Sequence, residues 1–338
     1  MMLRPGKLPP DVLSRLLGRI PHRDPRVLLG PGVGRDAAVI DLGGGRVLVA
    51  KTDPVTFATE DIGWYAVNVN ANDIACMGAR PSWFMATALL PDGAPDELPG
   101  RIFDQIVEAS SALGIELVGG HTEVTIGLDR PIIVGAMLGE ASREEIVTGE
   151  GIAEGDAIIM VGSAALEGAA LLAREAGGAL ERAGVSTGDI ARCRTFLRDP
   201  GISVVRAARE LCATTRPRYL HDPTEGGVAT ALHEMASVAG MTLRVDPAAI
   251  HLLREARVVC DALGLNPLGL LSSGALLAVV TSDGAQLLTA GDNQSMGRVI
   301  GRVELGAPGV ILEPDATPLP SFDRDEIARY FDGMAGGQ

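Results

Sequence analysis

Two spacings of apolar residues alternate along the chain and predict a mixture of helices and strands. Apolar residues recur every three or four positions in several segments, which is typical of helices with one buried face. These segments are 12–20, 96–113, 166–176, 202–212, 228–239 and 252–263, and small residues predict a further helix at 63–77. Short apolar runs bounded by turn residues predict strands at 37–40, 47–50, 83–90, 115–118, 131–138, 157–161, 275–280 and 299–303. Because both kinds of element occur in each half, we expect an α+β fold.

The length of the chain predicts two domains. It has 338 residues, whereas a single core usually takes roughly 100–200. A polar turn at 152–156 precedes an apolar run, and we place the boundary beside it, between domains 1–150 and 151–338. Each half sets glycine and acidic residues beside apolar strands, so we expect both domains to contribute to one site.

The excess of acidic residues argues against nucleic acid and anionic lipid as binding partners. The formal net charge is −14, whereas binding to nucleic acid or anionic lipid needs clustered lysine and arginine. An acidic protein can still bind a polyanion such as ATP if carboxylates hold a divalent cation beside it. The start of the chain lacks a signal pattern, no stretch approaches about 20 apolar residues, and the four cysteines are scattered. We therefore expect a cytoplasmic protein that binds neither nucleic acid nor membrane.

The first candidate for chemistry is a glycine-rich segment at 30–38. Its alternating glycines, Gly30, Gly32 and Gly34, let backbone N–H groups approach an anion without interference from a Cβ atom. The segment lacks the Gly-Lys-Ser/Thr ending of a Walker loop, and the strand predicted after it argues against a dinucleotide-binding fingerprint. A simple turn explains the same residues equally well.

Acidic residues recur at the predicted ends of strands and helices. Asp36, Asp53, Asp61 and Asp73 cannot share one helical face at their spacing, but strand ends in a compact domain can bring such groups around Mg²⁺. As alternatives, Asp61 caps the following helix and Asp53 starts a turn. Lys51, one of few lysines, either pairs with a phosphate or makes a surface ion pair.

A glycine pair opens a predicted helix in the second half. Gly226 and Gly227 precede the helix at 228–239, whose apolar residues fall on one face, so its N-terminus can receive an anion. Capping of this helix by Thr224 is an equally good interpretation.

Histidines are the natural candidates for proton transfer, because imidazole titrates near neutral pH. His121 and His221 can act in this way during phosphoryl transfer to an amide-like oxygen. A lone histidine is nevertheless more often a hydrogen-bonded structural residue, and we interpret His233, on the predicted helix, as structural.

Five blocks of residues resemble, in order, the signatures of one superfamily. It joins aminoimidazole-ribonucleotide synthetase, selenophosphate synthetase, thiamine-monophosphate kinase and HypE, and the resemblance spans roughly residues 10–310. The asparagine-aspartate and histidine-aspartate blocks are the most specific. The histidine-aspartate block and the segment 260–268 together make HypE-type hydrogenase-maturation proteins the most similar group. The blocks are Gly32–Ala38, Thr52-Asp53, Asn72–Pro81, Gly119–Thr122 and His221–Gly227.

The resemblance implies a PurM-like architecture of two α/β sandwich lobes, in which the N-terminal lobe dimerises through its sheet. It implies ATP and Mg²⁺ as cofactors, with ATP in a cleft and the metal near Asp36, Asp53 and Asp73. His121, His221 and Asp222 are then expected to take part in catalysis. The expected nucleotide-binding residues are Gly34, Lys51, Asn72, Gly119, Gly120, Thr122, Gly226 and Gly227.

The sequence departs from the HypE pattern in two respects. HypE-type proteins carry a C-terminal cysteine that their ATP chemistry modifies, whereas the last cysteine here is Cys260, so we do not carry that self-modification over. His121 stands where HypE and thiamine-monophosphate kinases have an aspartate and selenophosphate synthetases a histidine, which puts one metal ligand in doubt. A selenophosphate synthetase is not expected, because the reactive cysteine or selenocysteine near the N-terminus of those proteins has no counterpart before Cys76. Cys76 itself follows a helical pattern typical of a buried thiol.

These patterns and the resemblance lead to one main hypothesis. We expect an ATP- and Mg²⁺-dependent homodimeric enzyme that phosphorylates an oxygen of a small amide, carboxylate or phosphate-bearing substrate, largely by positioning and electrostatics. The alternative is a non-catalytic nucleotide-binding scaffold that works with a partner protein in metalloenzyme maturation.

Overall fold

The computed structural model describes residues 8, 10–21, 23–32, 37–56, 58, 60–289 and 297–335 of the chain. The chain divides into two compact units. One is Leu17–Ile146, and the other is Val147–Gln338 together with the segment that ends at Leu16. The first helix, α1 (Pro10–Leu17), is short, as its sequence predicts.

The unit Leu17–Ile146 is built on a six-stranded sheet in the order β1-β2-β3-β6-β4-β5. Neighbouring strands are antiparallel, apart from β4 and β5, which run parallel. β5 therefore forms one edge of the sheet, and β3 lies inside it. The strands are β1 (Val27–Leu29), β2 (Ala38–Gly43), β3 (Arg46–Val55), β4 (Arg80–Pro91), β5 (Glu116–Thr125) and β6 (Ile132–Ser142).

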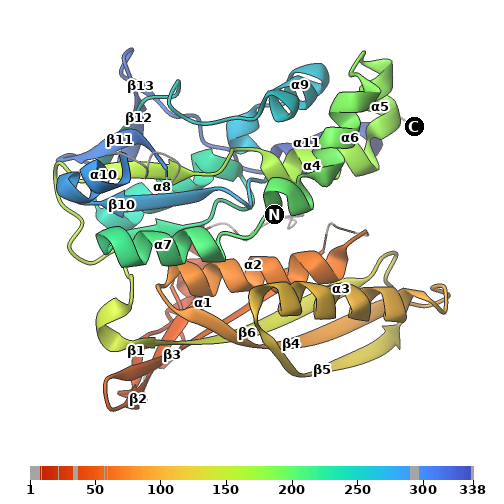
Figure 1. Cartoon of the computed structure of the whole chain (residues 1–338), viewed down its shortest axis with the longest axis horizontal. Coiled ribbons are helices and arrows are strands. Elements are labelled where there is room, and N and C mark those ends of the chain that lie inside the picture. The colour runs from red at the N-terminus through yellow and green to blue at the C-terminus, as the bar shows by residue number, and fades with distance from the viewer. Residues whose placement is uncertain are drawn as a thin grey trace. The chain divides into compact units, whose positions relative to one another are not determined.

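Two helices cover one face of this sheet (Figure 1). The helix α2 (Ile62–Cys76) packs on β3 and β6, and α3 (Leu98–Leu113) packs on α2. A glycine of β6 makes the close approach of α2 possible, because a Cβ atom on Gly135 would lie 2.3 Å from Asn70 Nδ2. The small residues along α2 and β6 thus let a helix rich in polar side chains lie directly on the sheet.

The opposite face of the same sheet is apolar and only partly buried. Side chains alternate along β6, so Ile133 and Met137 are buried on the face that α2 covers, whereas their neighbours lie on the opposite face. Among the described residues of this unit, no helix packs on that face. We call it the bare sheet face, and its half-buried residues on β6 are Ile132, Val134, Ala136 and Leu138.

The second unit contains a seven-stranded sheet in the order β13-β12-β9-β11-β7-β10-β8. All neighbouring pairs whose registers are known are antiparallel, except β12 with β9. The strands are β7 (Ala157–Val161), β8 (Tyr219–His221), β9 (Thr242–Val245), β10 (Leu276–Val280), β11 (Arg298–Glu304), β12 (Gly309–Leu312) and β13 (Thr317–Pro318).

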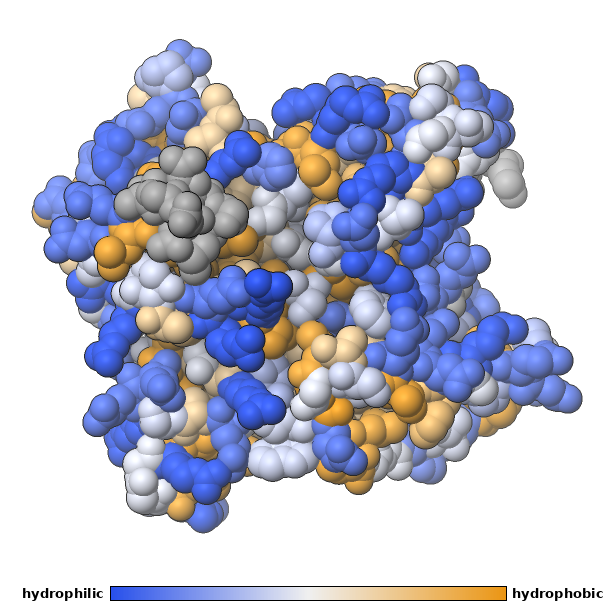
Figure 2. Space-filling view, in the orientation of Figure 1, coloured by the Kyte–Doolittle hydropathy of each residue, from blue (hydrophilic) through white to orange (hydrophobic). Residues whose placement is uncertain are grey.

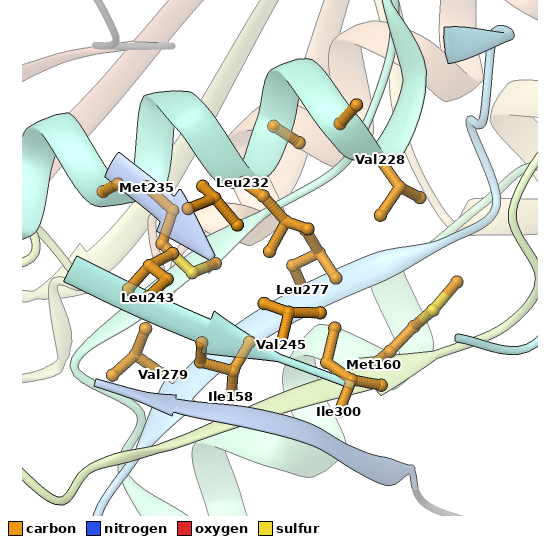
Figure 3. Packing of buried hydrophobic residues seen from close by; sticks show 14 of the residues in the cluster. Ile158, Met160, Val228, Leu232, Met235, Leu243, Val245, Leu277, Val279 and Ile300 are labelled. Carbon is orange, nitrogen blue, oxygen red and sulfur yellow. The ribbon is translucent and has the colours of Figure 1, made fainter. Parts of the chain in front are cut away.

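The helix α8 (Gly227–Ala239) forms the centre of this unit's core (Figure 3). Its Val228, Leu232 and Met235 point at apolar side chains of the sheet, all of them buried. Full burial of each such side chain is worth about 1.5–3 kcal/mol, so α8 is held by its apolar face. The sheet residues that it meets include Ile158, Met160, Leu243, Val245, Leu277, Val279 and Ile300.

The remaining helices belong to the second unit. The helices α7 (Val205–Thr215) and α10 (Ser282–Thr289) contact β10, whose five residues are all buried. α4, α6 and α9 pack on one another to form a helical cluster beside the sheet. The three helices of this cluster are α4 (Leu166–Glu175), α6 (Thr187–Thr195) and α9 (Arg254–Leu263). The two other helices of the unit are α5 (Gly177–Arg182) and α11 (Glu326–Ala335).

The expected α+β fold is confirmed, since each of the two units contains one sheet with helices packed on it. Several short elements were not predicted, among them β8, β9 and α11. No helix among the described residues has the length and apolar character needed to cross a membrane.

Candidate functional site

The first cluster of predicted site residues lies where β3 meets α2. Lys51 and Asp53 alternate with Thr52 along β3, so their side chains lie on the face that α2 covers. Lys51 Nζ is 3.1 Å from Asp73 Oδ2 on α2 and 3.8 Å from Asp53 Oδ2. The structure therefore brings three predicted residues, two acidic and one basic, around a single point.

A row of buried polar side chains on α2 fixes this cluster. Asn70 Nδ2 donates to the Asp53 carbonyl oxygen at 3.3 Å and to the Ala66 carbonyl oxygen at 2.9 Å, which ties the helix to the strand. Asn68 and Asn72 are also buried, as is Asp73. Polar residues seldom fill a buried helix without a functional reason, so this row marks α2 as part of a site.

The charges of the cluster suit a cation. Two carboxylates share one ammonium group, which leaves a net negative charge among the largely buried Lys51 and Asp73 and the partly exposed Asp53. Within the described ranges, no group of three or more His, Cys, Asp or Glu side chains has the geometry to hold a metal ion. Asp36 and Gly34, which the sequence assigned to the same site, lie outside the described residues.

Asp61 does not cap α2, so that alternative is wrong. Asp61 has left-handed backbone angles (φ 54°, ψ 20°), and its side chain makes no capping hydrogen bond. The first turn is held from α3 instead, because the Gly63 N–H donates to Gln105 Oε1 at 3.0 Å.

The predicted phosphate-binding residues of the first domain lie elsewhere on the sheet. Gly119, Gly120, His121 and Thr122 are exposed on the edge strand β5. The register aligns Asp53 with Gly135, Gly135 with Ala86 and Ala86 with Gly120. Three strand spacings of about 4.8 Å separate the two ends of this row, roughly 14 Å. One protomer therefore does not bring the β5 residues next to Lys51.

A solvent-open groove lies beside these β5 residues. It has a volume of about 780 Å³ and is formed by α3, β4 and β5. Phe103 and Val118 are exposed large apolar side chains in its lining, and Figure 2 shows apolar side chains gathered over this part of the surface. His121 Nε2 pairs with Glu123 Oε2 at 3.1 Å, and both side chains are exposed. The groove has the apolar character of a ligand or partner surface.

The second cluster is the histidine-aspartate block between β8 and α8. His221 ends β8, pairs in register with Leu277 of β10, and its Nε2 is 2.8 Å from Glu234 Oε2 on α8. Its ring stacks on Tyr219 with centroids 6.0 Å apart, and Asp222 is buried. The strand and the helix thus fix the imidazole between an aromatic ring and a carboxylate.

The glycine pair after this block has steric reasons to be glycine. Gly226 and Gly227 are both left-handed (φ 76° and 60°), and a Cβ on Gly227 would lie 2.6 Å from the carbonyl oxygens of Leu268 and Leu270. The side chain of Thr224 does not cap α8, so that alternative is wrong. Its carbonyl oxygen instead accepts the Gly227 N–H at 3.0 Å.

Sequence reasoning missed Asp325, whose carboxylate contacts the glycine pair. Its Oδ2 accepts the Gly226 N–H at 2.7 Å. Burial raises the pKa of Asp325 to about 7, and the nearby carboxylates Glu167 and Glu225 add to this shift. Burial also raises the pKa of Glu167. The only signal in the sequence was an Asp-Glu pair before a short amphipathic segment, which by itself predicts no more than a helix start.

The cysteine predictions can be compared directly with the structure. Cys76, Cys193 and Cys260 are buried, as expected for Cys76, and Cys212 is partly exposed. Burial raises the pKa of Cys193 and of Cys260 to about 12. Thiols with such pKa values are poor nucleophiles at neutral pH.

The sequence matches two family models along most of its length. The AIR synthase related protein, N-terminal domain, matches residues 34–141, and the corresponding C-terminal domain matches residues 153–312. Carbamoyl dehydratase HypE of Cupriavidus necator is 30% identical over 278 residues, which are 80% of this chain and 76% of that protein. The HypE of Rhizobium leguminosarum bv. viciae is 31% identical over 264 residues, 76% of this chain and 72% of that protein.

Solved structures show the same fold. The hydrogenase maturation protein HypE in complex with ATP superposes with a TM-score of 0.69 at 25% identity, covering 90% of this chain and 92% of that one. A structure of AaThiL complexed with AMPPCP and TMP gives a TM-score of 0.71 at 20% identity, covering 92% and 94%. With family models and relatives in agreement, the chain belongs to the AIR synthase-related family and, within it, to the HypE-like proteins.

Proposed function

We propose that this protein is an ATP- and Mg²⁺-dependent enzyme that phosphorylates an oxygen of a small substrate, with an amide oxygen as the first candidate. The observation that carries the proposal is the cluster of Lys51, Asp53 and Asp73 on β3 and α2. The relatives named carbamoyl dehydratase and the ATP complex of HypE support the same reaction class.

The donor set of this cluster fits a magnesium ion. Asp53 and Asp73 face the same ammonium group, so both carboxylates are close enough to one point to share a cation. Carboxylate oxygens are the ligands that Mg²⁺ prefers, and it keeps water and phosphate oxygens as its other ligands. Bound there, the ion would neutralise charge on the phosphate oxygens during transfer. Asp36 is proposed as a further ligand on the strength of the family resemblance.

The remaining proposed residues bind the nucleotide or move protons. Lys51 supplies a positive charge for a phosphate group, and Asn72 lies one residue before Asp73 on the same buried helix. Gly34, Gly119, Gly120, Thr122, Gly226 and Gly227 are proposed to contact the nucleotide, the glycines through their backbones. His221, oriented by Glu234, is proposed to transfer a proton at the substrate, with Asp222 beside it in sequence and His121 as a second candidate.

The bare sheet face supports a homodimer. Its half-buried apolar residues on β6 are of the kind that subunit interfaces bury. A second copy that packs its own sheet there would cover this surface.

A partner protein and the cellular location stay predictions. A HypE–HypF complex has been solved, and that HypE shares 22% identity with this chain, which supports the fold alone. We propose a partner in metalloenzyme maturation and a cytoplasmic location on the family resemblance and the composition.

Nucleotide binding and turnover test the proposed function. Calorimetry should show ATP binding that Mg²⁺ strengthens, and a phosphate-release assay with small amides and carboxylates should show turnover. Asp53→Asn should lower both by about tenfold or more, since it removes one charged ligand. Asp129→Asn is the matched control, because Asp129 is an exposed carboxylate of the same unit that pairs only locally with Arg130.

Two results would decide against the enzyme. A wild-type protein that binds neither ATP nor ADP with Mg²⁺ would remove the whole proposal. Normal nucleotide binding without turnover, in the presence of candidate substrates and partners, would favour the non-catalytic scaffold.

A further inference from the structure

A single buried carboxylate joins two parts of the second unit that are far apart in sequence. Asp325 Oδ2 accepts the Gly226 N–H at 2.7 Å, and its Oδ1 accepts the Ile327 N–H at 2.8 Å. Only 7% of the residue is exposed. The carboxylate therefore ties the first turn of α11 to the loop between β8 and α8.

The first turn of α11 has other anchors that do not involve Asp325. Glu326 Oε2 accepts the Asn266 N–H at 2.9 Å and pairs with Arg329 at 2.6 Å. Arg329 Nη2 also donates to the Gly264 carbonyl oxygen at 3.0 Å. Because these bonds hold α11 on the 264–266 segment, removing the Asp325 carboxylate should leave the turn in place.

The loop on the other side of the bond has fixed ends. His221 is held by β10 and by Glu234, and Gly227 is wedged against the backbone of Leu268 and Leu270. The segment 222–226 spans these two fixed points. The Gly226 N–H bond to Asp325 is therefore a third support, and it acts on the last residue of the segment, next to Gly227.

A carboxylate is an unfavourable choice for this position on stability grounds alone. Two further carboxylates, Glu167 on α4 and Glu225 in the loop, lie near enough to raise the pKa of Asp325. A neutral residue would avoid this repulsion and the cost of burying a charge. Groups kept in costly surroundings are more often needed for function than for stability.

We propose that Asp325 is a positioning residue for the phosphoryl transfer: by accepting the Gly226 N–H it fixes the 222–226 segment, and with it Asp222, in the conformation that reacts. This role rests on the proposed function. Asp325 does not touch substrate in this scheme, so its loss should affect the reaction step more than nucleotide binding.

The test compares Asp325→Asn with Glu326→Gln in the full chain. Both changes replace a buried carboxylate with its amide in the same turn, but only the first touches the Gly226 N–H. We expect D325N to lower kcat by about tenfold to a hundredfold, because misplacement of catalytic groups by about 1 Å costs that much. The Kd for ATP should change by less than about threefold, and E326Q should stay near wild type in both.

Hydrogen exchange measures the positioning itself, without any need for turnover. Exchange of the peptide that contains 222–227 should speed up in D325N and stay unchanged in E326Q. Unchanged exchange in D325N, an equal loss of kcat in E326Q, or a loss of ATP affinity as large as the loss of kcat would each overturn the proposal. A wild-type protein that binds no ATP would remove the proposed function, while exchange would still decide the role of Asp325.

Discussion

Lys51 shows how much one side chain contributes to the proposed site. It is one of only two lysines among the 29 basic residues of the chain, so a lysine at this position contrasts with a strong general use of arginine. An ammonium group is compact and can approach two carboxylates from β3, whereas the wide guanidinium fork prefers bidentate pairing.

The charge of Lys51 can be removed without shortening its side chain. Lys51→Met should weaken Mg²⁺–ATP binding by about tenfold to a hundredfold, because a charge-assisted contact to phosphate is worth roughly 1.5–3 kcal/mol. Calorimetry measures the change. Arg46→Met, on the same strand but paired with Glu140 at 2.6 Å, is the control and should bind ATP as wild type does. Equal losses in the two variants would mean that net charge alone matters.

Asp325 also predicts a pH dependence of stability. Burial raises its pKa to about 7 from the ordinary value of 3.8, so the folded protein holds this proton more tightly than the unfolded chain does. The resulting stabilisation is complete below about pH 4 and is lost as the pH rises through about 7. The Asp325→Asn variant has no carboxyl group to titrate, so it does not lose stability in this way. The free energy of unfolding of the variant minus that of wild type should therefore rise with pH, by up to about 4 kcal/mol.

Urea unfolding between pH 4 and pH 8 measures that difference. Glu326→Gln serves as the comparison, because the pKa of Glu326 is lowered and its contribution runs in the opposite direction with pH. A difference between D325N and wild type that stays constant with pH would show that Asp325 titrates normally.

At the scale of elements, α8 has a glycine at each end, and the two positions require glycine for different reasons. Gly227 is the first residue of α8 and Gly240 directly follows its last residue, and both are left-handed (φ 60° and 65°). A Cβ on Gly227 would collide with backbone oxygens at 2.6 Å, whereas a Cβ on Gly240 would meet no heavy atom within 4 Å. A side chain at Gly240 would therefore cause backbone strain alone, whereas a side chain at Gly227 would cause both strain and a steric clash.

Alanine substitutions at these glycines should have unequal costs. Gly240→Ala should lower the free energy of unfolding by about 1–2 kcal/mol, which is the cost of a left-handed non-glycine residue. Gly227→Ala should lose a further 1–3 kcal/mol or so from overpacking. Chemical denaturation checks both values, and equal losses would contradict the close packing against Leu268 and Leu270.

The sequence predicts an element well when a local apolar pattern stabilises it, and poorly when strands far away in the sequence do. α3 and α8 carry a repeating apolar face, so their periodicity alone located them to within two residues. β8 (Tyr219–His221) and β9 (Thr242–Val245) are too short to show a period, and they exist because β10 and β11 pair with them. Long-range pairing of that kind leaves no local signal.

The same distinction applies to the candidate site. The family motifs indicated Asp53 and Asp73, and the scarcity of lysines indicated Lys51. The alternation of side chains along β3, together with the position of α2, brings the three together. The sequence could not show that Gly120 lies three strands away from Asp53, because strand order is set by the whole sheet. It could not indicate Asp325 either, since its partner, Gly226, lies 99 residues earlier in the chain.

At the scale of the whole molecule, the bare sheet face predicts self-association. The double substitution Val134→Glu and Leu138→Glu places two charges on this face. If two copies pack there, the dimer should weaken by about a hundredfold or more, since each buried charge costs several kcal/mol. Sedimentation velocity at micromolar concentration would then show monomers.

A control separates the interface from a general effect of added charge. Leu305→Glu changes an exposed apolar residue of the other unit and should leave the sedimentation coefficient unchanged. A wild-type protein that is already monomeric at these concentrations would rule out the proposed dimer.

The Lys51 ammonium group between Asp53 and Asp73 has a consequence for the stability of the protein when metal ions are removed. Because the Lys51 ammonium group lies between these two acids and offsets one of their two negative charges, we expect the fold to hold without a bound metal. A chelating agent should therefore leave the thermal midpoint of the nucleotide-free protein where it was. Any activity lost on chelation would then report on the reaction and not on unfolding.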